Sequence, residues 1–522
     1  MDEMKGRILW VDDEIELLRP HIRLLVDKGY SVETATNGED AVALVKSTAF
    51  DLVFLDEMMA GMGGLRTLAE IKDLHPSLPV VMITKNEEES LMEEAIGSKI
   101  NDYLTKPVNP SQVLMACKKF LEGKKIAGAA VSRDYIQGFN QLSAALMTGP
   151  DYNEWISIYS RLSDWAMELD THTELGLKQT LTDQLRECNL AFGKYVEKHY
   201  RDWIAQKSDR PTLSPEVVDR FVIPEIQSGK SVILFVIDCL RLDQWRVMES
   251  LLHDYFTITT QYYYSILPTA TPYSRNAIFS GSYPSDLELR FPELWEKSED
   301  DETSRNRYEK QFLEKLLERR KIVLKPELKY VKILDPEFGR SIESNIGTYA
   351  QSKLTAIVVN FVDMLAHGRS DSTLLKEIAP DESAYRTLTQ SWFLHSSLFG
   401  MLKTLSRNKN VKVLLTTDHG SIRCLRGTKV LGDREASTNL RYKYGRNLKA
   451  EDKAAIFVKD PAEYRLPRRG VTVNYIIAKE DYYFVYPTDY HRYLNQYRDS
   501  FQHGGVSLEE VILPMATLEP KG

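Results

Sequence analysis

The sequence predicts an α/β protein built from several domains, and three observations support this fold class. Short apolar runs alternate with amphipathic stretches over the first 120 residues, the pattern of a parallel sheet covered by helices. No strand pattern occurs between residues 125 and 205. The alternation returns after a stretch rich in Pro and Ser at 206–216. At 522 residues the chain has room for several cores, so we expect domains at 1–122, 123–207 and 208–522.

Composition places the chain among ordinary globular proteins, with 43% hydrophobic and 27% charged residues. The four cysteines have no metal-binding or redox spacing, which indicates reduced thiols and a cytoplasmic location. No apolar run is long enough to span a bilayer, so we expect no membrane insertion.

The net charge of −8 argues against a nucleic-acid coat protein. One basic stretch, at 421–446, carries seven Arg and Lys residues against Asp433 and Glu435, and we expect either a phosphate-binding surface or a solvated face. The charged segment 296–310 is expected to be an exposed insertion.

In the first domain, each predicted strand ends in a polar residue. Ligands bind at this edge of a parallel sheet, so these side chains should surround one point. Carboxylates there suit Mg²⁺, and a cation beside them would neutralise a phosphoryl group received by Asp56. The residues are Asp12 and Asp13 after "RILWV", Asp56 ending "LVFLD", Thr84 ending "VVMIT", and Lys106 ending "DYLTK".

The motifs "WVDDE", "VFLDEMM", "MIT" and "YLTKP" together resemble response-regulator receiver domains. The resemblance implies a flavodoxin-like fold and phosphorylation of Asp56 by a sensor histidine kinase. It further implies Mg²⁺ held by Asp12, Asp13 and Asp56, and a switch through Thr84, Tyr103 and Lys106. A phosphorylation-dependent homodimer is the expected response.

The middle domain is predicted to be a small helical bundle. Apolar and aromatic residues recur there at spacings of three and four, which places them on one helical face: Tyr152, Trp155, Tyr159, Leu162, Ala166 and Leu169. Such a stripe is typical of a core, so we assign it no chemistry and expect the bundle to couple its neighbours.

The last domain has three predicted strands, "SVILFVID", "TAIVVNFVD" and "VKVLLTTD", that end in Asp238, Asp363 and Asp418. Histidines accompany them: His419 follows Asp418, His367 lies four residues after Asp363, and His503 lies in "FQHGGVSLEE". A spacing of four places Asp363 and His367 on one helical face, where both can bind one ion. The pattern predicts a metal site.

A nucleophile candidate lies in "LPTATPYSRNAIFSG". Proline favours the first helical position, which makes Thr271 the expected N-cap, beside free backbone N–H groups that attract phosphate. An ordinary helix cap is the alternative reading, and Thr269 is the alternative hydroxyl.

Residues 210–522 resemble the alkaline phosphatase superfamily, and its PglZ branch in particular. The motifs that carry the resemblance are "DCLRLDQW", "TATPYSRNAIFSG", "VDMLAHG", "TTDHG", "RYKYGRN" and "HGGVSLEE". The resemblance implies that Asp363, His367 and His503 bind one metal ion. It implies a second ion bound by Asp238, Asp418, His419 and the Thr271 hydroxyl.

Mixed His and carboxylate ligands fit two Zn²⁺ ions, with Mn²⁺ as the alternative. Thr271 would be the nucleophile. Arg241 is the candidate for the phosphate contact, with a salt-bridge role as its alternative.

Receiver, helical and PglZ segments in this order resemble response regulators tied to type IX secretion. The first hypothesis is a phosphorylation-controlled, zinc-dependent phosphodiesterase acting on oligonucleotides or cyclic nucleotides. The second is a non-catalytic adaptor that binds an extracytoplasmic-function sigma factor or a transcription complex. No helix-turn-helix or zinc-finger spacing is visible, which disfavours direct DNA reading.

Overall fold

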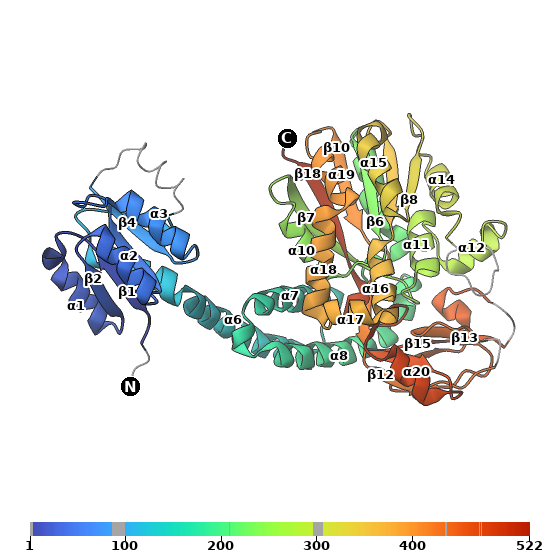
Figure 1. The fold of residues 1–522 in the computed structure, drawn as a ribbon. Coiled ribbons are helices and arrows are strands. Elements are labelled where there is room, and N and C mark those ends of the chain that lie inside the picture. The colour runs from blue at the N-terminus through green and yellow to red at the C-terminus, as the bar shows by residue number, and fades with distance from the viewer. Residues whose placement is uncertain are drawn as a thin grey trace. The chain divides into compact units, whose positions relative to one another are not determined.

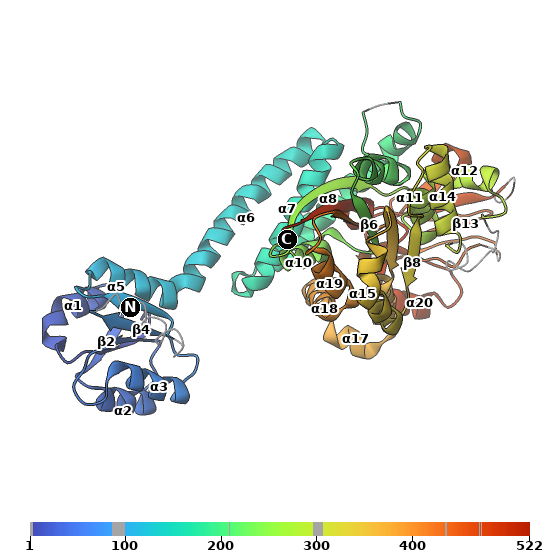
Figure 2. The same ribbon diagram turned by 90° about the horizontal axis from the view of Figure 1, so that it is seen from above.

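A computed structural model describes most of the chain (Figures 1 and 2). It covers residues 4–85, 100–207, 209–295, 306–433, 436–468, 470 and 472–522. The predicted insertion at 296–310 therefore lies largely outside the described residues. The chain divides into two compact units, Met1–Ile136 and Gln137–Gly522, which are described separately. No helix among the described residues has both the length and the apolar character needed to cross a membrane.

The first unit is built on a five-stranded parallel sheet in the order β2-β1-β3-β4-β5. Its strands are β1 (Arg7–Val11), β2 (Ser31–Ala35), β3 (Leu52–Asp56), β4 (Val80–Thr84) and β5 (Asp102–Thr105). Helices α2 (Gly38–Ser47) and α3 (Gly64–Leu74) pack on one face, and α1 (Arg19–Asp27) and α5 (Pro110–Cys117) pack on the other. Apolar strand residues are thus buried on both faces, as the flavodoxin-like prediction requires.

Three long helices follow, and they confirm the predicted helical linker: α6 (Gly123–Thr148), α7 (Tyr152–Thr171) and α8 (Lys178–Ile204). The division into two units falls within α6. Helix α7 begins with a capping box, in which Asp151 accepts hydrogen bonds from the backbone of Asn153 and Glu154. The aromatic stripe of α7 packs against α8, with the rings of Trp155 and Phe192 5.2 Å apart.

The second unit contains a six-stranded sheet in the order β7-β18-β10-β6-β9-β8. Its strands are β6 (Ser231–Ile237), β7 (Phe256–Tyr264), β8 (Lys329–Ile333), β9 (Leu354–Val359), β10 (Val411–Thr416) and β18 (Ile512–Pro520). Strands β10, β6, β9 and β8 are parallel, so their carboxyl ends meet at one edge. Helices α11 (Thr271–Ser280) and α14 (Glu309–Arg319) cover one face with apolar side chains.

Further helices pack around the sheet or, like α20, beside the small sheets next to it (Figure 1). They include α10 (Leu242–Ser250), α12 (Pro284–Arg290), α15 (Pro336–Tyr349), α16 (Phe361–Asp371), α17 (Thr373–Ile378), α18 (Glu382–His395), α19 (Ser397–Leu405), α20 (Tyr490–Tyr497) and α21 (Leu508–Val511). Shorter strands form three small sheets. Their members are β11 (Ile422–Cys424) with β17 (Ser500–Gln502), β12 (Arg426–Lys429) with β16 (Tyr482–Val485), and β15 (Asn474–Ala478) between β13 (Tyr442–Gly445) and β14 (Ala455–Val458).

The stretch 421–446 contributes to these small sheets, where four of its described cations are buried or paired while Lys429 and Arg446 are exposed, so it forms neither a wholly solvated face nor a fully exposed basic surface. Arg441 is fully buried, and its Nη2 lies 2.5 Å from the Glu510 carboxylate. Lys443 is also buried and donates to two backbone carbonyls, and burial lowers its pKa to about 7. Arg423 pairs with Asp499, and Arg426 with Glu480 and Asp481. Arg434 and Glu435 lie outside the described residues.

Candidate phosphorylation site and metal centre

The carboxyl ends of the first sheet bring three acidic residues together. Ligand oxygens of Asp12, Asp13 and Asp56 all lie within 4.8 Å of one another. The Lys106 ammonium lies 3.0 Å from Asp12 Oδ2 and 3.0 Å from Asp56 Oδ2. Burial raises the pKa of the Asp56 carboxyl above its ordinary value, and the hydrogen bond from Lys106 opposes this rise. Hard oxygen ligands of this kind fit Mg²⁺.

The predicted switch residues flank this acidic cluster. Thr84 ends β4 and is buried, and its carbonyl accepts a hydrogen bond from the Lys106 backbone at 2.8 Å. Tyr103 lies on β5 with 42% of its surface exposed. Thr84 is therefore joined to the phosphoacceptor region through the segment that carries Lys106. Part of the segment expected to move, residues 86–99, lies outside the described residues.

The second site is assembled from the corresponding ends of the larger sheet. Asp238 directly follows β6, and Asp418 and His419 follow β10. Asp363 was expected at a strand end but lies in the first turn of α16, because β9 stops at Val359. The same helix carries His367 one turn later, so the predicted spacing of four residues places both side chains on one face of a regular helix.

The first metal-ligand cluster contains Asp363, His367 and His503. Nε2 of His367 lies 3.4 Å from Asp363 Oδ1, and Nε2 of His503 lies 3.6 Å from the same oxygen. Burial opposes ionisation of Asp363, but the two imidazoles outweigh it and hold the pKa of this carboxyl below its usual range. His503 enters the cluster from the end of β17, more than a hundred residues from the other two.

The second cluster contains Asp238, Asp418 and His419, all of which are buried. Nε2 of His419 lies 3.6 Å from Asp238 Oδ1 and 3.7 Å from Asp418 Oδ2. The rings of His419 and His503 stack with centroids 4.3 Å apart, so the two clusters are neighbours. The six predicted ligands are thus assembled into two adjacent groups.

Thr271 lies beside the second cluster. Its Oγ1 is 2.9 Å from His419 Nε2 and 3.3 Å from Asp238 Oδ1. The prediction that Thr271 is the N-cap is wrong by one residue: Ala270 has the extended N-cap conformation, and Thr271 is the first helical residue of α11. Its hydroxyl therefore faces the cluster instead of capping the helix. Thr269 makes backbone contacts instead, donating to the Gly505 carbonyl at 2.7 Å and accepting from the Gly504 N–H.

The chemistry of the second cluster fits a bound cation. Neither carboxylate oxygen of Asp418 has a hydrogen-bond partner among the described residues, although the side chain is fully buried. Burial, followed by the neighbouring Asp238, raises the pKa of Asp418 well above its usual value. A buried carboxylate that accepts no hydrogen bond is costly unless a cation compensates it. Imidazole nitrogens and carboxylate oxygens are the donors that Zn²⁺ takes in proteins.

A buried arginine at this site escaped the sequence reasoning. Arg275 Nη1 lies 2.6 Å from Asp238 Oδ2 and 3.7 Å from Asp418 Oδ2, and its Nε lies 2.5 Å from Glu309. Its spacing of four residues from Thr271 places both side chains on one face of α11, and this spacing could have identified Arg275 as a site residue. No local pattern predicts its long-range partner Glu309, on α14.

Arg241 is engaged elsewhere. Its guanidinium lies 2.5 Å from the carboxylates of Asp243 and Glu382 and over the rings of Tyr385 and Phe501. Since these carboxylates neutralise the charge, the contacts favour the alternative salt-bridge role over a phosphate contact.

Comparison with protein families identifies the class of protein that this fold and site define. Residues 8–118 match the response regulator receiver domain, 125–204 the PorX response regulator linker domain, and 217–518 the BREX system PglZ alkaline phosphatase-like domain. The chain belongs to the PglZ alkaline phosphatase-like family, and it carries this domain in a response regulator of PorX-like architecture.

Curated relatives share the receiver part. The chain is 39% identical over 124 residues to the alginate biosynthesis transcriptional regulatory protein AlgB of Pseudomonas aeruginosa, covering 24% of this chain and 28% of that protein. It is 37% identical over 122 residues to the transcriptional regulatory protein ZraR of Salmonella typhimurium, covering 23% and 28%. The chain thus spans less than a third of the length of these relatives.

Solved structures match the same region. Chemotaxis protein CheY4 of Vibrio cholerae is 28% identical, covering 22% of this chain and 98% of that chain, with a TM-score of 0.22. The receiver domain of NtrX from Brucella abortus is 35% identical with the same coverages and a TM-score of 0.21.

Proposed function

We propose that this response regulator is a metal-dependent phosphodiesterase with Thr271 as its nucleophile, controlled by phosphorylation of Asp56. One observation carries the proposal: the Thr271 hydroxyl lies 2.9 Å from His419 Nε2 and 3.3 Å from Asp238 Oδ1. A structural threonine at a helix start needs no place among buried metal-type ligands. The position suits a hydroxyl that shares a cation with those ligands.

Two Zn²⁺ ions are the cations that these residues suit best, with Mn²⁺ as the alternative. Asp363, His367 and His503 would hold one ion, and Asp238, Asp418, His419 and the Thr271 hydroxyl the other. Bound zinc supplies Lewis-acid stabilisation of phosphoryl oxygens and lowers the pKa of a bound hydroxyl. In the receiver domain, Asp12, Asp13 and Asp56 would hold Mg²⁺.

The reaction proceeds in two displacements at phosphorus. Thr271 Oγ forms a bond to phosphorus while the bond to the leaving alkoxide breaks, and the hydroxyl proton of Thr271 ends on that alkoxide, which departs as the alcohol. This gives a phosphothreonine. Water then attacks the same phosphorus, the bond to Oγ breaks, and the Thr271 hydroxyl is regenerated. Burial of Asp238, Asp418 and His419 excludes competing water from this side of Thr271.

The proposed substrates are oligonucleotides or cyclic nucleotides, as family resemblance suggests. The described residues of 421–446 lend no support to a surface for flanking phosphates, because its arginines are largely paired. A sensor histidine kinase would phosphorylate Asp56, a homodimer would form in response, and the output would regulate type IX secretion. An extracytoplasmic-function sigma factor is the candidate downstream partner.

Substitution of Thr271 by valine tests the proposal, because valine keeps the shape of the side chain and removes its oxygen. We expect Thr271→Val to retain zinc and to lose roughly a thousandfold in turnover of bis-p-nitrophenyl phosphate. Wild type should cleave this diester faster than the monoester. The matched control, Thr269→Val, removes a nearby hydroxyl that contacts only backbone groups of 504–505 in the described structure.

Near wild-type hydrolysis by Thr271→Val with its metals in place would show that Thr271 is structural. A wild-type protein that cleaves neither ester with zinc or manganese would leave the non-catalytic adaptor as the function.

A further inference from the structure

Among the contacts that helix α8 of the linker makes with the PglZ domain, one is a buried amide close to the metal-ligand loops. Asn189 is 3% exposed, and its Nδ2 donates to the Glu509 carboxylate at 3.0 and 3.3 Å. The Asn189 Oδ1 accepts the Leu508 N–H at 2.8 Å. Both hydrogen-bonding ends of a single linker side chain are thus used to hold residues 508–509.

The segment that Asn189 holds lies directly against a loop with a metal-type ligand. A Cβ at position 420 would lie only 1.9 Å from the Glu509 carbonyl oxygen, so Gly420 is packed against that carbonyl. The Gly420 N–H donates to the Glu510 carbonyl at 3.3 Å. Because Gly420 follows His419, any displacement of residues 509–510 is passed to His419 without an intervening side chain.

The same segment is tied to the loop that follows His503. The Glu510 carboxylate accepts the Gly505 N–H at 2.8 Å and is itself paired with buried Arg441. Residues 508–510 therefore stand between Asn189 of the linker and two of the histidines, His419 and His503, whose rings stack across the two clusters.

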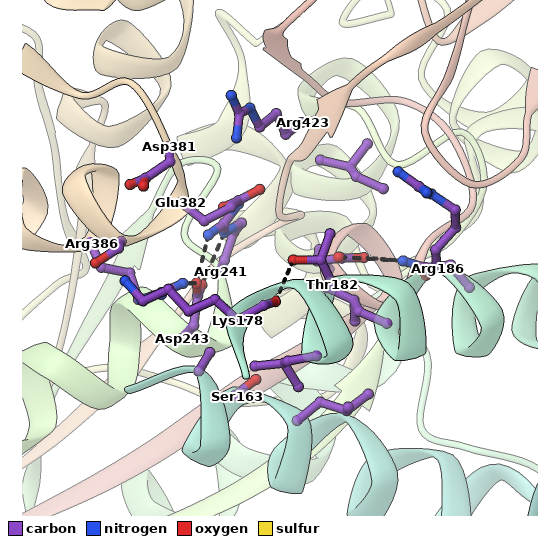
Figure 3. Close-up of a pocket in the computed structure, with 18 of the residues that line it drawn as sticks. Ser163, Lys178, Thr182, Arg186, Arg241, Asp243, Asp381, Glu382, Arg386 and Arg423 are labelled. Atoms are coloured by element: carbon purple, nitrogen blue, oxygen red, sulfur yellow. Dashed lines mark hydrogen bonds and ion pairs between the residues drawn. The ribbon is translucent and has the colours of Figure 1, made fainter. Parts of the chain in front are cut away.

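Helix α7 makes a second connection, through charges, and Figure 3 shows its PglZ members Arg386, Asp243 and Arg241. Asp170 pairs with Arg386 Nη2 at 2.7 Å, and Arg386 Nη1 pairs with Asp243 at 2.9 Å. Asp243 in turn pairs with Arg241, the N-cap residue of α10. Arg241 lies three residues after Asp238 in the loop that follows β6. The chain of charges thus runs from the linker to the loop of a third ligand.

A cavity of about 260 Å³ separates the two connections. Its linker wall combines apolar residues such as Leu162 and Leu181 with the charged Lys178 and Arg186, and its PglZ wall includes Arg241, Asp243 and Arg386. Helix α7 also packs directly on α10 and α18, and Asp170 and Asn189 at the border of the cavity add polar contacts between the linker and the PglZ domain.

We propose that Asn189 and Asp170 are positioning residues through which the linker helices set the geometry of the metal-ligand loops and thereby the rate of the reaction. This inference rests on the proposed function for its catalytic consequence. Its structural part, control of the order of the 418–421 and 503–511 loops by the linker, stands on the contacts alone.

The decisive experiment compares Asn189→Leu with Gln179→Leu in the full chain. Both replace an amide on α8, but Gln179 is exposed and bonds only to Asp183 among the described contacts. We expect Asn189→Leu to accelerate backbone hydrogen exchange in 418–421 and 503–511 about tenfold. Turnover should fall about tenfold with KM little changed, the size typical of residues that orient metal ligands. Gln179→Leu should match wild type in all three measurements.

Exchanging the polarity of the contact provides the rescue. Asn189→Asp combined with Glu509→Gln keeps one donor and one acceptor and should restore slow exchange and turnover. The second connection is tested by Asp170→Asn against Asp183→Asn, with faster exchange expected in 238–243 for the former only. Asp170→Asn keeps the side-chain shape and remains informative if Asn189→Leu does not fold.

Unchanged exchange in these loops for folded Asn189→Leu and for Asp170→Asn overturns the inference. If wild type hydrolyses no ester, the proposed function fails while hydrogen exchange still decides the positioning role. Fast exchange in Asn189→Leu with wild-type turnover would overturn the link to catalysis.

Discussion

The receiver site and the PglZ site each place carboxylates at the carboxyl ends of the parallel strands of their own sheet. The two sites differ in how the negative charge of these carboxylates is compensated. In the receiver, Lys106 lies 3.0 Å from both Asp12 and Asp56, and Asp13 is exposed. In the PglZ domain, Asp238 and Asp418 are buried, and Arg275 pairs closely with Asp238 while lying 3.7 Å from Asp418. The receiver site has buried Asp12 and Asp56 but is open to solvent at Asp13, and such an open site suits an ion that comes and goes with a phosphoryl group. A buried, undercompensated one suits a resident ion.

The largest effect on stability should come from removing the compensating cation of each site in a separate variant. Arg275→Met leaves Asp238 and Glu309 buried without their partner, so we expect a loss of about 3–5 kcal/mol in unfolding free energy. Lys106→Met should cost less, because Mg²⁺ can replace the ammonium charge beside Asp12 and Asp56, although both carboxylates are buried. Chemical denaturation of each variant measures the difference. Equal losses would show that burial does not distinguish the two sites.

The second prediction concerns the resident ion. Asp418→Asn should lose about one of two zinc equivalents, measured by elemental analysis of the purified chain. Chelation should lower wild-type stability by about 3 kcal/mol relative to protein with zinc at a hundredfold excess over its Kd. Asp13→Asn, the matched change in the open site, should leave zinc unchanged. A folded wild type that takes up no transition metal would contradict the zinc assignment.

The third prediction concerns the open site. Beryllofluoride or acetyl phosphate should raise the mass of wild type in light scattering toward that of a dimer. The expected cause is that a phosphoryl group at Asp56 binds Lys106 and Thr84 and shifts the segments that carry them. Asp56→Asn should not respond, whereas Asp73→Asn, an exposed acid on α3, should respond like wild type. An identical response of wild type and Asp56→Asn would refute the switch.

The smallest effect is a pH dependence specific to the PglZ unit. Burial raises the pKa of Glu509 to about 7, above its unfolded value, so folding takes up a proton there. Its stabilising contribution is complete below the unfolded pKa and is lost as pH rises through 7. Between pH 6 and 7 we expect a loss of about 1 kcal/mol in wild type, and a flatter profile for Glu509→Gln. An unchanged slope in that variant would exclude Glu509 as the group that titrates.

Much of the site could be predicted because short sequence patterns around its residues identify them. Asp56, Asp238 and Asp418 each stand at or just after the end of an apolar run, where strands of a parallel sheet present ligands. Asp363 and His367 are separated by one helical turn. The sequence did not determine the exact start of α11, since Thr271 and Ala270 both suit the boundary, and only the extended backbone of Ala270 identifies it as the N-cap.

The sequence by itself determined the three-part order of domains, the strand ends that carry ligands, and the family motifs, because periodicity and short spacings express these directly. Only the tertiary structure decided which charges are compensated. Arg275 contacts Glu309 at a sequence separation of 34 residues, Arg441 contacts Glu510 at 69, and Asn189 contacts Glu509 at 320. Local patterns do not encode such pairs, since burial and partner are set when distant segments pack together. For this reason 421–446 has the composition of a basic surface, whereas in the fold Arg441 and Lys443 are buried and Arg423 and Arg426 are paired, with Lys429 and Arg446 exposed.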